Sequence, residues 1–268
     1  MLTKFENIIW EGEPSLVMLE NVLFGHTVNY MPAEKFSVAE GLMKEVEVAL
    51  RRLSVSFLSV RAETTTALLI GSATGLGTLT TEVPLSWDPI LELPVIPGST
   101  LKGVARAWLE DYLDNAVGEA RGVGDIFGSK DVVSRLTFYD AYPIAAEKSL
   151  LTLDIVNPHY NPVTNPDLKI ELDVQPKPVK HVAVAPGVTF HIVVAATPST
   201  CHKVIGLYKI LREKVDEAGK PSSHTRDYAA LALLTSASLA HGVGGRTLKG
   251  YGKLRVTRAE LHLAGDSI

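Results

Sequence analysis

Apolar residues follow two different spacings along this chain. From Ser37 to about Arg52 they recur every three to four residues, which predicts a helix. Short apolar or alternating runs bounded by turn residues predict strands at 53–63, 66–77, 135–144, 149–156, 188–196 and 253–263. Helical spacing returns directly after Pro97, at 202–218 and at 227–240. This mixture predicts an α+β fold, in which helices pack on one face of a mainly antiparallel sheet.

Composition excludes several classes of protein. Hydrophobic residues make up 46% of the 268 positions, which is enough for a substantial core. The single cysteine, Cys201, excludes an internal disulfide and a cysteine-rich zinc site. No apolar run reaches the length of a membrane helix, and the first residues lack the basic and apolar stretches of a signal peptide. We therefore expect a cytoplasmic protein that makes no contact with a membrane.

The charge distribution is uneven. The chain has 26 basic and 30 acidic side chains, a net charge of −4. Residues 241–258 nevertheless contain five lysines and arginines and no acid. Such a local excess indicates a surface that binds a polyanion, and a solvated basic strand is an equally good interpretation of the charge alone.

The segment IPGSTLKGVARAWLE combines a helix start with two cations. Ser99 has the hydroxyl of a typical N-cap, and the residues behind it form a buried stripe: Leu101, Val104, Ala105, Trp108, Leu109, Tyr112 and Leu113. Lys102 and Arg106 lie four residues apart on the other side. Free amides, a hydroxyl and two cations at a helix start favour a bound phosphate, the alternative being two ordinary solvated side chains.

The segment HGVGGRTLKGYGKLRV has five glycines in eleven residues. Gly244 and Gly245 allow a close approach of the backbone, Arg246 and Lys249 supply charge, and Tyr251 offers a stacking face. The spacing matches neither a Walker loop nor a dinucleotide fingerprint. The segment therefore favours contact with a nucleic-acid backbone, with a plain helix-to-strand turn as the alternative.

Residues 154–187 contain six of the fifteen prolines and little periodicity. Proline stiffens a chain, so this stretch is predicted to be a projecting arm. It carries several basic or aromatic side chains: His159, Tyr160, Lys169, Lys177, Lys180 and His181. Asp154 and His159 could form an acid–base pair, although a histidine that fixes the base of the arm fits the spacing better. The eight histidines show no metal-binding spacing, so no metal or other cofactor is expected.

Four segments in this order resemble the RAMP proteins of CRISPR systems. They are LPVIPGSTLKGVARAWLE, IFGSKDVVSRLTFYDAYPI, LTLDIVNPHY and HGVGGRTLKGYGKLRV. Within that family they look most like the sixth subunit of the type III-B effector, the Cmr complex. The resemblance spans about Ser54 to Val256, and the first thirty residues match nothing in the pattern.

The resemblance implies a single domain over 1–268 with a ferredoxin-like (RRM-like) core. Residues 1–52 would form an N-terminal extension and helix, and 154–187 the proline-rich thumb. Such subunits form a backbone along a guide RNA, and the sixth lies near the guide's 3′ end. The implied partners are guide RNA, target RNA and other Cmr subunits, both backbone and small ones.

The resemblance also assigns the RNA-binding residues. The first helix would contribute Ser99, Lys102 and Arg106; the glycine-rich segment Gly244, Gly245, Arg246 and Lys249; and the thumb Lys177 and Lys180. Tyr251, as a stacking face, and His159, in the same arm, complete the predicted RNA-binding set.

The sixth subunit is expected to be non-catalytic, so no catalytic residue is assigned. Two alternatives remain open. One is a metal-independent RNA endonuclease with His159 or His181 as general acid–base. The other is a target-cleaving backbone subunit, for which Asp154 is the candidate.

Overall fold

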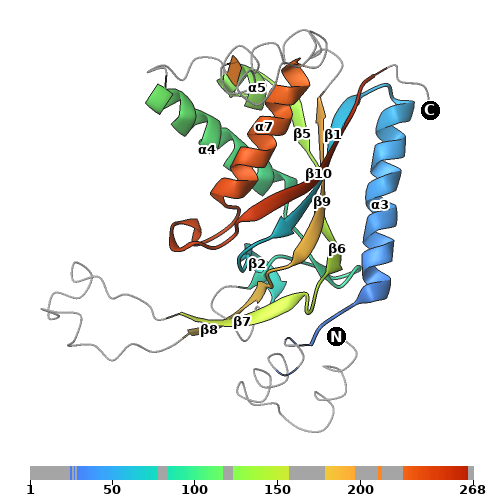
Figure 1. Ribbon diagram of the computed structural model, residues 1–268, viewed down its shortest axis with the longest axis vertical. Coiled ribbons are helices and arrows are strands. Elements are labelled where there is room, and N and C mark those ends of the chain that lie inside the picture. Colours follow the sequence, from blue (N-terminus) through green and yellow to red (C-terminus); the bar gives the residue numbers. More distant parts are fainter. Residues whose placement is uncertain are drawn as a thin grey trace, which may run out of the picture.

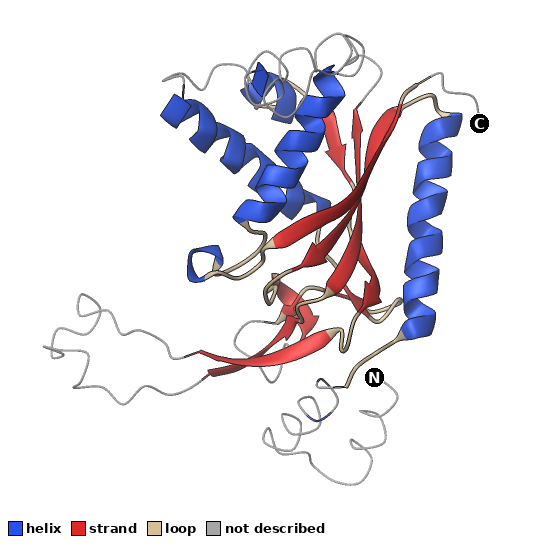
Figure 2. Ribbon diagram, in the orientation of Figure 1, coloured by secondary structure: helices blue, strands red, loops and turns tan. Residues whose placement is uncertain are grey.

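The computed structural model describes residues 29–77, 84–116, 123–156, 179–196 and 226–264, together with residues 25, 27, 211 and 212. Figure 1 labels the helices and strands along the chain, and Figure 2 distinguishes helix from strand in the same view. The elements are, in order, α3 (Ala33–Arg52), β1 (Ser56–Thr64), β2 (Gly71–Leu76), β3 (Trp87–Asp88), β4 (Leu93–Pro94), α4 (Gly98–Ala116), α5 (Val123–Phe127), β5 (Leu136–Phe138), β6 (Tyr142–Ala146), β7 (Leu151–Val156), β8 (Val179–Val184), β9 (Val188–Ala196), α7 (Arg226–His241), the 3-10 turn η3 (Thr247–Lys249) and β10 (Leu254–His262).

The main sheet is antiparallel, with strand order β10-β1-β9-β5 and with β6 also paired to β9. Its two central strands, β1 and β9, are buried along almost their whole length. This arrangement confirms the predicted α+β fold and is consistent with a ferredoxin-like core. The predicted helix at 202–218 lies outside the described residues except for residues 211 and 212.

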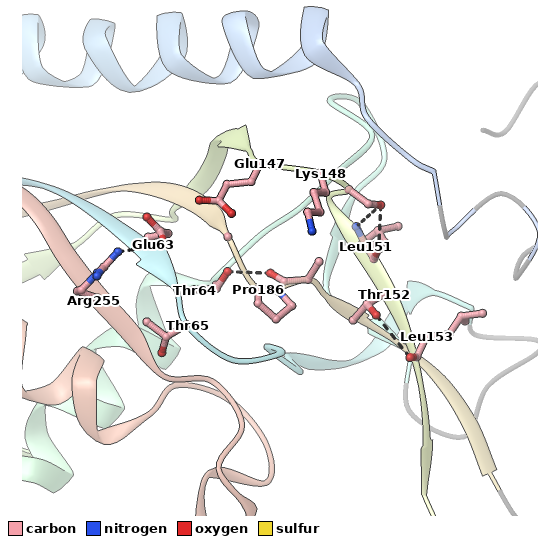
Figure 3. A pocket seen from close by; sticks show the side chains of 13 residues that line it. Glu63, Thr64, Thr65, Glu147, Lys148, Leu151, Thr152, Leu153, Pro186 and Arg255 are labelled. Carbon is pink, nitrogen blue, oxygen red and sulfur yellow. Dashed lines mark hydrogen bonds and ion pairs between the residues drawn. The ribbon is translucent and has the colours of Figure 1, made fainter.

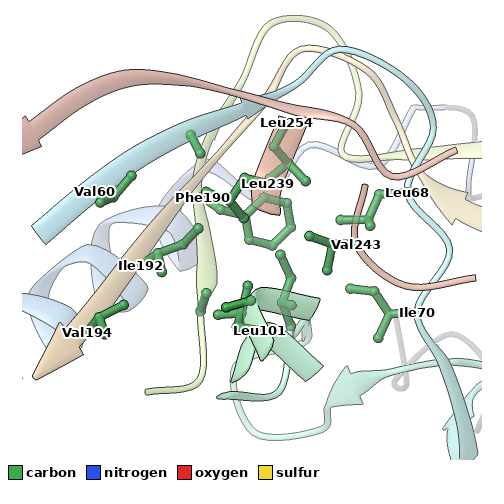
Figure 4. Close-up of a cluster of buried hydrophobic side chains, with 14 of the residues drawn as sticks. Val60, Leu68, Ile70, Leu101, Phe190, Ile192, Val194, Leu239, Val243 and Leu254 are labelled. Carbon is green, nitrogen blue, oxygen red and sulfur yellow. The ribbon is translucent and has the colours of Figure 1, made fainter. Parts of the chain in front are cut away.

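One face of the sheet carries the main hydrophobic core, under α4 and α7. Figure 4 shows side chains from both helices and from β1 and β9 meeting around Phe190. The predicted stripe of α4 is confirmed, because Leu101, Ala105, Leu109 and Leu113 are all at most 3% exposed. Successive strand residues point to opposite faces, so this core takes alternate residues of β9.

The remaining residues of β9 point to the second face, which α3 covers (Figure 1). Met43 and Leu50 of α3 pack there against Phe57 and Val193. The expectation that helices pack on one face only therefore needs a correction. The physical reason is that β9 also carries apolar residues on its second side, Val193 and Ala195, and these require cover.

A polar cluster lies within the α3 face. Ser59 Oγ donates a hydrogen bond to Glu47 Oε1 at 2.6 Å, and His191 Nε2 lies 2.8 Å from the same oxygen. Burial alone would raise the pKa of Glu47, but the hydrogen bonds from His191 and Ser59 lower it to about 2. These contacts stabilise the ionised carboxylate and attach α3 to the sheet.

Strands β7 and β8 form a separate two-stranded ribbon, in which Asp154 lies opposite His181. The ribbon leaves the body on the side away from α3 (Figure 1). The described residues of the predicted arm, 154–187, are the end of β7, the whole of β8 and the turn at 185–187, and residues 157–178 lie outside the described part of the chain. Residues 182–187 need a correction, because Val182, Val184 and Ala185 are buried in the core and belong to the body.

Among the described residues, no helix combines the length and the apolar character that a membrane span requires.

Candidate nucleic-acid interface

Helix α4 begins differently from the sequence prediction. It starts at Gly98, so Ser99 is its second residue and not its N-cap, and the Ser99 side chain is exposed. The first amide, Gly98 N, donates instead to Asp140 Oδ1 at 2.7 Å. Asp140 lies between β5 and β6, and sequence spacing gave no sign of this partner. An internal carboxylate thus supplies the negative charge at the helix start that a phosphate was predicted to supply.

Gly98 is required by packing within the protein. A Cβ at this position would lie 2.0 Å from the carbonyl oxygen of Phe138 in β5. Only glycine lets the helix start approach the strand so closely.

The two cations of α4 differ in their surroundings. Arg106 Nε pairs with Glu110 Oε1 at 2.8 Å, and Arg106 Nη1 lies 3.5 Å from the carbonyl oxygen of Gly128. Lys102 is partly buried and contacts no acid among the described residues. Arg106 is therefore partly neutralised by its own helix, whereas Lys102 keeps its charge for another partner.

The glycine loop, residues 242–252, connects α7 to β10 and is anchored by backbone hydrogen bonds. Gly245 N donates to Leu69 O at 2.7 Å, Gly252 N donates to Ala67 O at 2.8 Å, and Val243 N donates to Gly252 O at 2.8 Å. Val243 itself is fully buried in the main core (Figure 4). The base of the loop is thus part of the folded body.

Two glycines of this loop are needed for contacts inside the protein. A Cβ on Gly244 would lie 2.3 Å from Leu69 O, and one on Gly252 would lie 1.9 Å from Val243 O. Both residues also have positive φ, +83° and +69°. At these positions glycine therefore serves a positive φ and a close approach to the chain's own backbone, and a close approach to a ligand stays a prediction.

The tip of the loop is the part that faces solvent. Arg246 adopts a left-handed conformation and starts the turn η3, which presents Leu248 and Lys249 outward. Among the five cations of residues 241–258, Arg255 pairs with Glu63 at 3.3 Å and Arg258 pairs with Glu260. The side chains of Arg246, Lys249 and Lys253 contact no acid in the part of the chain that the structure describes. These three cations are available to an anionic ligand.

Tyr251 was predicted to offer its ring for stacking, and the structure shows it engaged with the ribbon. Its hydroxyl donates a hydrogen bond to Asp154 Oδ2. Its ring centroid lies 6.4 Å from that of His181, the residue opposite Asp154. Sequence spacing did not reveal this contact, because the two segments are 97 residues apart.

His181 lies beneath this contact and is 2% exposed. Its pKa is lowered chiefly by burial and further by the charge of Arg246, while Asp154 acts in the opposite direction. His181 Nε2 is buried and has no hydrogen-bond partner within the described residues. The neutral ring is therefore favoured.

The structure joins some of the predicted residues and leaves others apart. The glycine loop and the base of the ribbon are in contact through Tyr251, and Lys180 lies exposed on β8. No hydrogen bond or ion pair connects Ser99, Lys102 or Arg106 to the glycine loop among the described residues. His159 and Lys177 lie outside the described part of the chain.

An open cleft of about 610 Å³ lies where the body meets the ribbon, and no sequence motif had indicated it. Figure 3 shows Glu147 and Lys148 on one side, and the ion pair between Glu63 and Arg255 on the other. The cleft carries two charges of each sign, so it does not have the single-signed character expected for a phosphate site.

Known proteins resemble this chain in sequence and in fold. The model of the RAMP superfamily matches residues 61–255. The CRISPR system CMR subunit Cmr6 of Saccharolobus solfataricus is 32% identical over 219 residues, which are 82% of this chain and 63% of that protein. This chain therefore spans less than two thirds of the length of that relative.

Two solved structures are also similar. A chain in the cryo-EM structure of the type III-B Cmr-beta bound to cognate target RNA superposes with a TM-score of 0.66 at 27% identity, covering 88% of this chain and 69% of that one. The crystal structure of Cmr6 from Pyrococcus furiosus gives a TM-score of 0.42 at 22% identity, covering 76% of this chain and 99% of that one. The resemblance inferred from the motifs is confirmed. Because the family model covers more than half of its residues, including the start of α4 and the glycine loop, the chain belongs to the RAMP superfamily.

Proposed function

We propose that this chain is an RNA-binding subunit of a type III-B CRISPR effector, the Cmr complex. In this proposal it is a non-catalytic part of the backbone and holds the guide RNA near its 3′ end. Guide RNA, target RNA and other Cmr subunits are its partners. The match to the RAMP superfamily and the likeness to Cmr6 and to a chain of the RNA-bound Cmr-beta support this assignment.

The observation that carries the proposal is the positive charge at the tip of the glycine loop and at Lys253 directly after the loop. Arg246, Lys249 and Lys253 have no acidic partner among the described residues, although the whole chain has a net charge of −4. Backbone hydrogen bonds and Val243 hold the loop in place, so the cations are presented from a fixed base. Phosphates positioned by such cations are recognised without regard to base sequence, which suits a protein that must accept many guides.

Two observations favour a non-catalytic role, one against each of the two catalytic alternatives. His181 is 2% exposed, so its ring is not accessible to an RNA 2′-hydroxyl. Asp154 already accepts hydrogen bonds from Tyr251 and from the amide of Ile155. Of the candidate groups, neither His181 nor Asp154 is therefore placed to act on RNA.

Purification from the cells that encode this chain tests the proposal. The tagged full chain should copurify with short guide RNAs of defined 3′ ends and with other Cmr subunits, as read by RNA sequencing and mass spectrometry. Ultraviolet crosslinks from the chain should map to the 3′ portion of the guide. Crosslinks confined to the guide's 5′ end would refute the placement, and recovery of neither guides nor Cmr subunits would refute the function.

A fourfold variant tests the site. Arg246→Ala and Lys249→Ala, combined with Lys102→Ala and Arg106→Ala, should weaken binding of single-stranded RNA and leave folding intact. Arg52→Ala removes one exposed cation from α3 on the opposite face of the sheet and is the matched control for each of the four single variants, which are measured alongside. RNA binding that survives all four changes would sink the assignment of these residues.

Incubation with repeat RNA, with and without a chelator, tests the catalytic alternative. We expect no discrete cleavage products. Products that disappear in His159→Ala would establish the endonuclease instead.

A further inference from the structure

Tyr251 connects two segments that both belong to the proposed RNA-binding region. It ends the glycine loop, and its hydroxyl donates to Asp154 Oδ2 on β7. The other carboxylate oxygen, Asp154 Oδ1, accepts from the amide of Ile155 at 2.7 Å. Both oxygens of Asp154 are thus engaged, which fixes the carboxylate that receives the tyrosine hydroxyl.

The same tyrosine also contacts the second strand of the ribbon. Asp154 lies directly opposite His181 in the β7–β8 register. The ring of Tyr251 is tilted by 36° against that of His181, with centroids 6.4 Å apart. Tyr251 therefore touches β7 through its hydroxyl and β8 through its ring.

The contact lies where the ribbon leaves the hydrophobic core. Toward the body, Leu151 and Val184 are at most 1% exposed, and Val184 exchanges two backbone hydrogen bonds with Leu68. Beyond the contact, Ile155 is 61% exposed. An isolated two-stranded ribbon is only marginally stable, so its direction depends on anchors at its base. Tyr251 supplies an anchor at this point, where the buried part of the ribbon ends.

We propose that Tyr251 is a positioning residue, which fixes the direction of the β7–β8 ribbon relative to Arg246 and Lys249 on the glycine loop. This inference rests on the proposed RNA-binding function. It replaces the predicted stacking role of Tyr251 with a role that acts through Asp154 and His181. An RNA strand that follows both the loop and the ribbon binds best when the two are held in one relative orientation, because the protein then loses less conformational entropy on binding.

The variant Tyr251→Phe tests this role, since it keeps the ring on His181 and removes only the hydrogen bond. We expect the affinity of the full chain for a fluorescent single-stranded RNA to fall about threefold to fivefold. The slope of log affinity against log salt should stay unchanged, because no phosphate contact is lost. Amide exchange should become faster in β7 and β8.

Tyr142→Phe is a closely matched control. Tyr142 Oη donates to Asp88 Oδ2 at 2.9 Å. This is also a hydrogen bond from a tyrosine hydroxyl to an aspartate carboxylate, and it lies away from the glycine loop and the ribbon. This variant should leave RNA affinity and exchange in the ribbon unchanged. Equal losses of RNA affinity in the two variants would show a general structural effect and would overturn the inference.

Substitution of Asp154 gives a second, independent measurement. Asp154→Asn keeps an oxygen that can accept from Tyr251 and should retain most of the affinity. Asp154→Ala should lose at least as much affinity as Tyr251→Phe, because it also removes the acceptor of the Ile155 amide. Since both changes break the same hydrogen bond between Tyr251 and Asp154, the double variant should be no weaker than Asp154→Ala alone. Full additivity would overturn the inference.

The failure of this inference can be told from failure of the proposed function. If Lys249→Ala weakens RNA binding and Tyr251→Phe does not, the loop binds RNA and the positioning role is wrong. If neither the parent chain nor its assembled complex binds RNA, the proposed function itself fails.

Discussion

The start of α4 and the glycine loop both combine glycine with cations in sequence. In the structure they differ in the partners of those cations. At both places glycine is required because the chain approaches its own backbone: Gly98 faces the carbonyl oxygen of Phe138, and Gly252 faces that of Val243. The cations differ. Arg106 is paired with Glu110, whereas Lys249 is exposed and has no acidic partner among the described residues.

This difference shows that a glycine-rich basic motif contains two separable parts. The glycines determine how the segment packs, and the cations determine whether it can bind an anion. Asp140 supplies negative charge at the start of α4, and no carboxylate in the described structure contacts the tip of the glycine loop. We therefore expect the glycine loop to be the better phosphate site of the two.

The largest effect is expected on stability, from substitution of a glycine whose packing the loop requires. Gly252→Ala places a Cβ 1.9 Å from Val243 O at φ +69°, and should destabilise the chain by about 3 kcal/mol or more. Gly250→Ala has the same kind of backbone, φ +89°, with open space around it, and should cost about 1 kcal/mol. Urea unfolding of the two variants measures the difference. Equal losses would mean that close packing is not the reason for Gly252.

A destabilising change on the opposite face of the sheet separates stability from RNA binding. Glu47→Ala removes the carboxylate between Ser59 and His191, and we expect a loss of about 2–3 kcal/mol. RNA affinity at a temperature where the variant is folded should not change. Glu45→Ala, an exposed position on the same helix, is the control and should unfold like the parent. Weaker RNA binding by the Glu47 variant would show that α3 takes part in the interface.

The Glu47 carboxylate should also make the stability of the chain depend on pH. The pKa of Glu47 is about 2 in the folded chain, below its ordinary value of 4.5. A group whose pKa is lowered by folding stabilises the protein above its unfolded pKa, and this contribution is lost as the pH falls through the folded value. The parent should therefore lose more stability than Glu47→Ala between about pH 5 and pH 2. Parallel stability curves would contradict this assignment.

Much of the fold could be predicted from hydrophobic spacing. The buried stripe of α4 and the apolar run of β9 each determine which side of an element is covered. The position of α3 could not be predicted so directly, because an amphipathic helix indicates that it packs but not on which face of a sheet. The burial of almost every residue of β9 indicates that both faces of the sheet are covered at this strand.

The site could be predicted only in part. Arg246 and Lys249 could be proposed because charge and glycine density are local properties of a sequence, and their binding of RNA stays a prediction. The partners of Gly98 and Tyr251 were not found, because Asp140 and Asp154 are 42 and 97 residues away from them. Contacts of that kind depend on strand pairing and on the turn that ends α7, and neither is encoded in residue spacing.

The helix start offers a smaller test of the comparison. Asp140→Ala leaves the amide of Gly98 without its acceptor and should destabilise the chain by about 1 kcal/mol. Ser99→Ala should have almost no effect, since Ser99 is an exposed residue inside the helix. Thermal unfolding of both variants shows which of the two residues, Asp140 or Ser99, caps the start of α4. A larger loss in Ser99→Ala would restore the serine as the cap.

The smallest effect distinguishes the cations of the two regions. Lys249→Ala should weaken binding of single-stranded RNA about threefold and lower the salt slope by about 0.7–1 unit, since one phosphate contact is lost. Arg106→Ala should change either quantity by less, because the guanidinium is already paired with Glu110 at 2.8 Å. Unrelated RNA sequences should be affected equally, as backbone contacts carry no base information. Neither variant should alter unfolding by more than about 0.5 kcal/mol, since both side chains are exposed. If Arg106→Ala proves the more damaging change, an RNA phosphate must displace Glu110 from its arginine, and the start of α4 would be the stronger site.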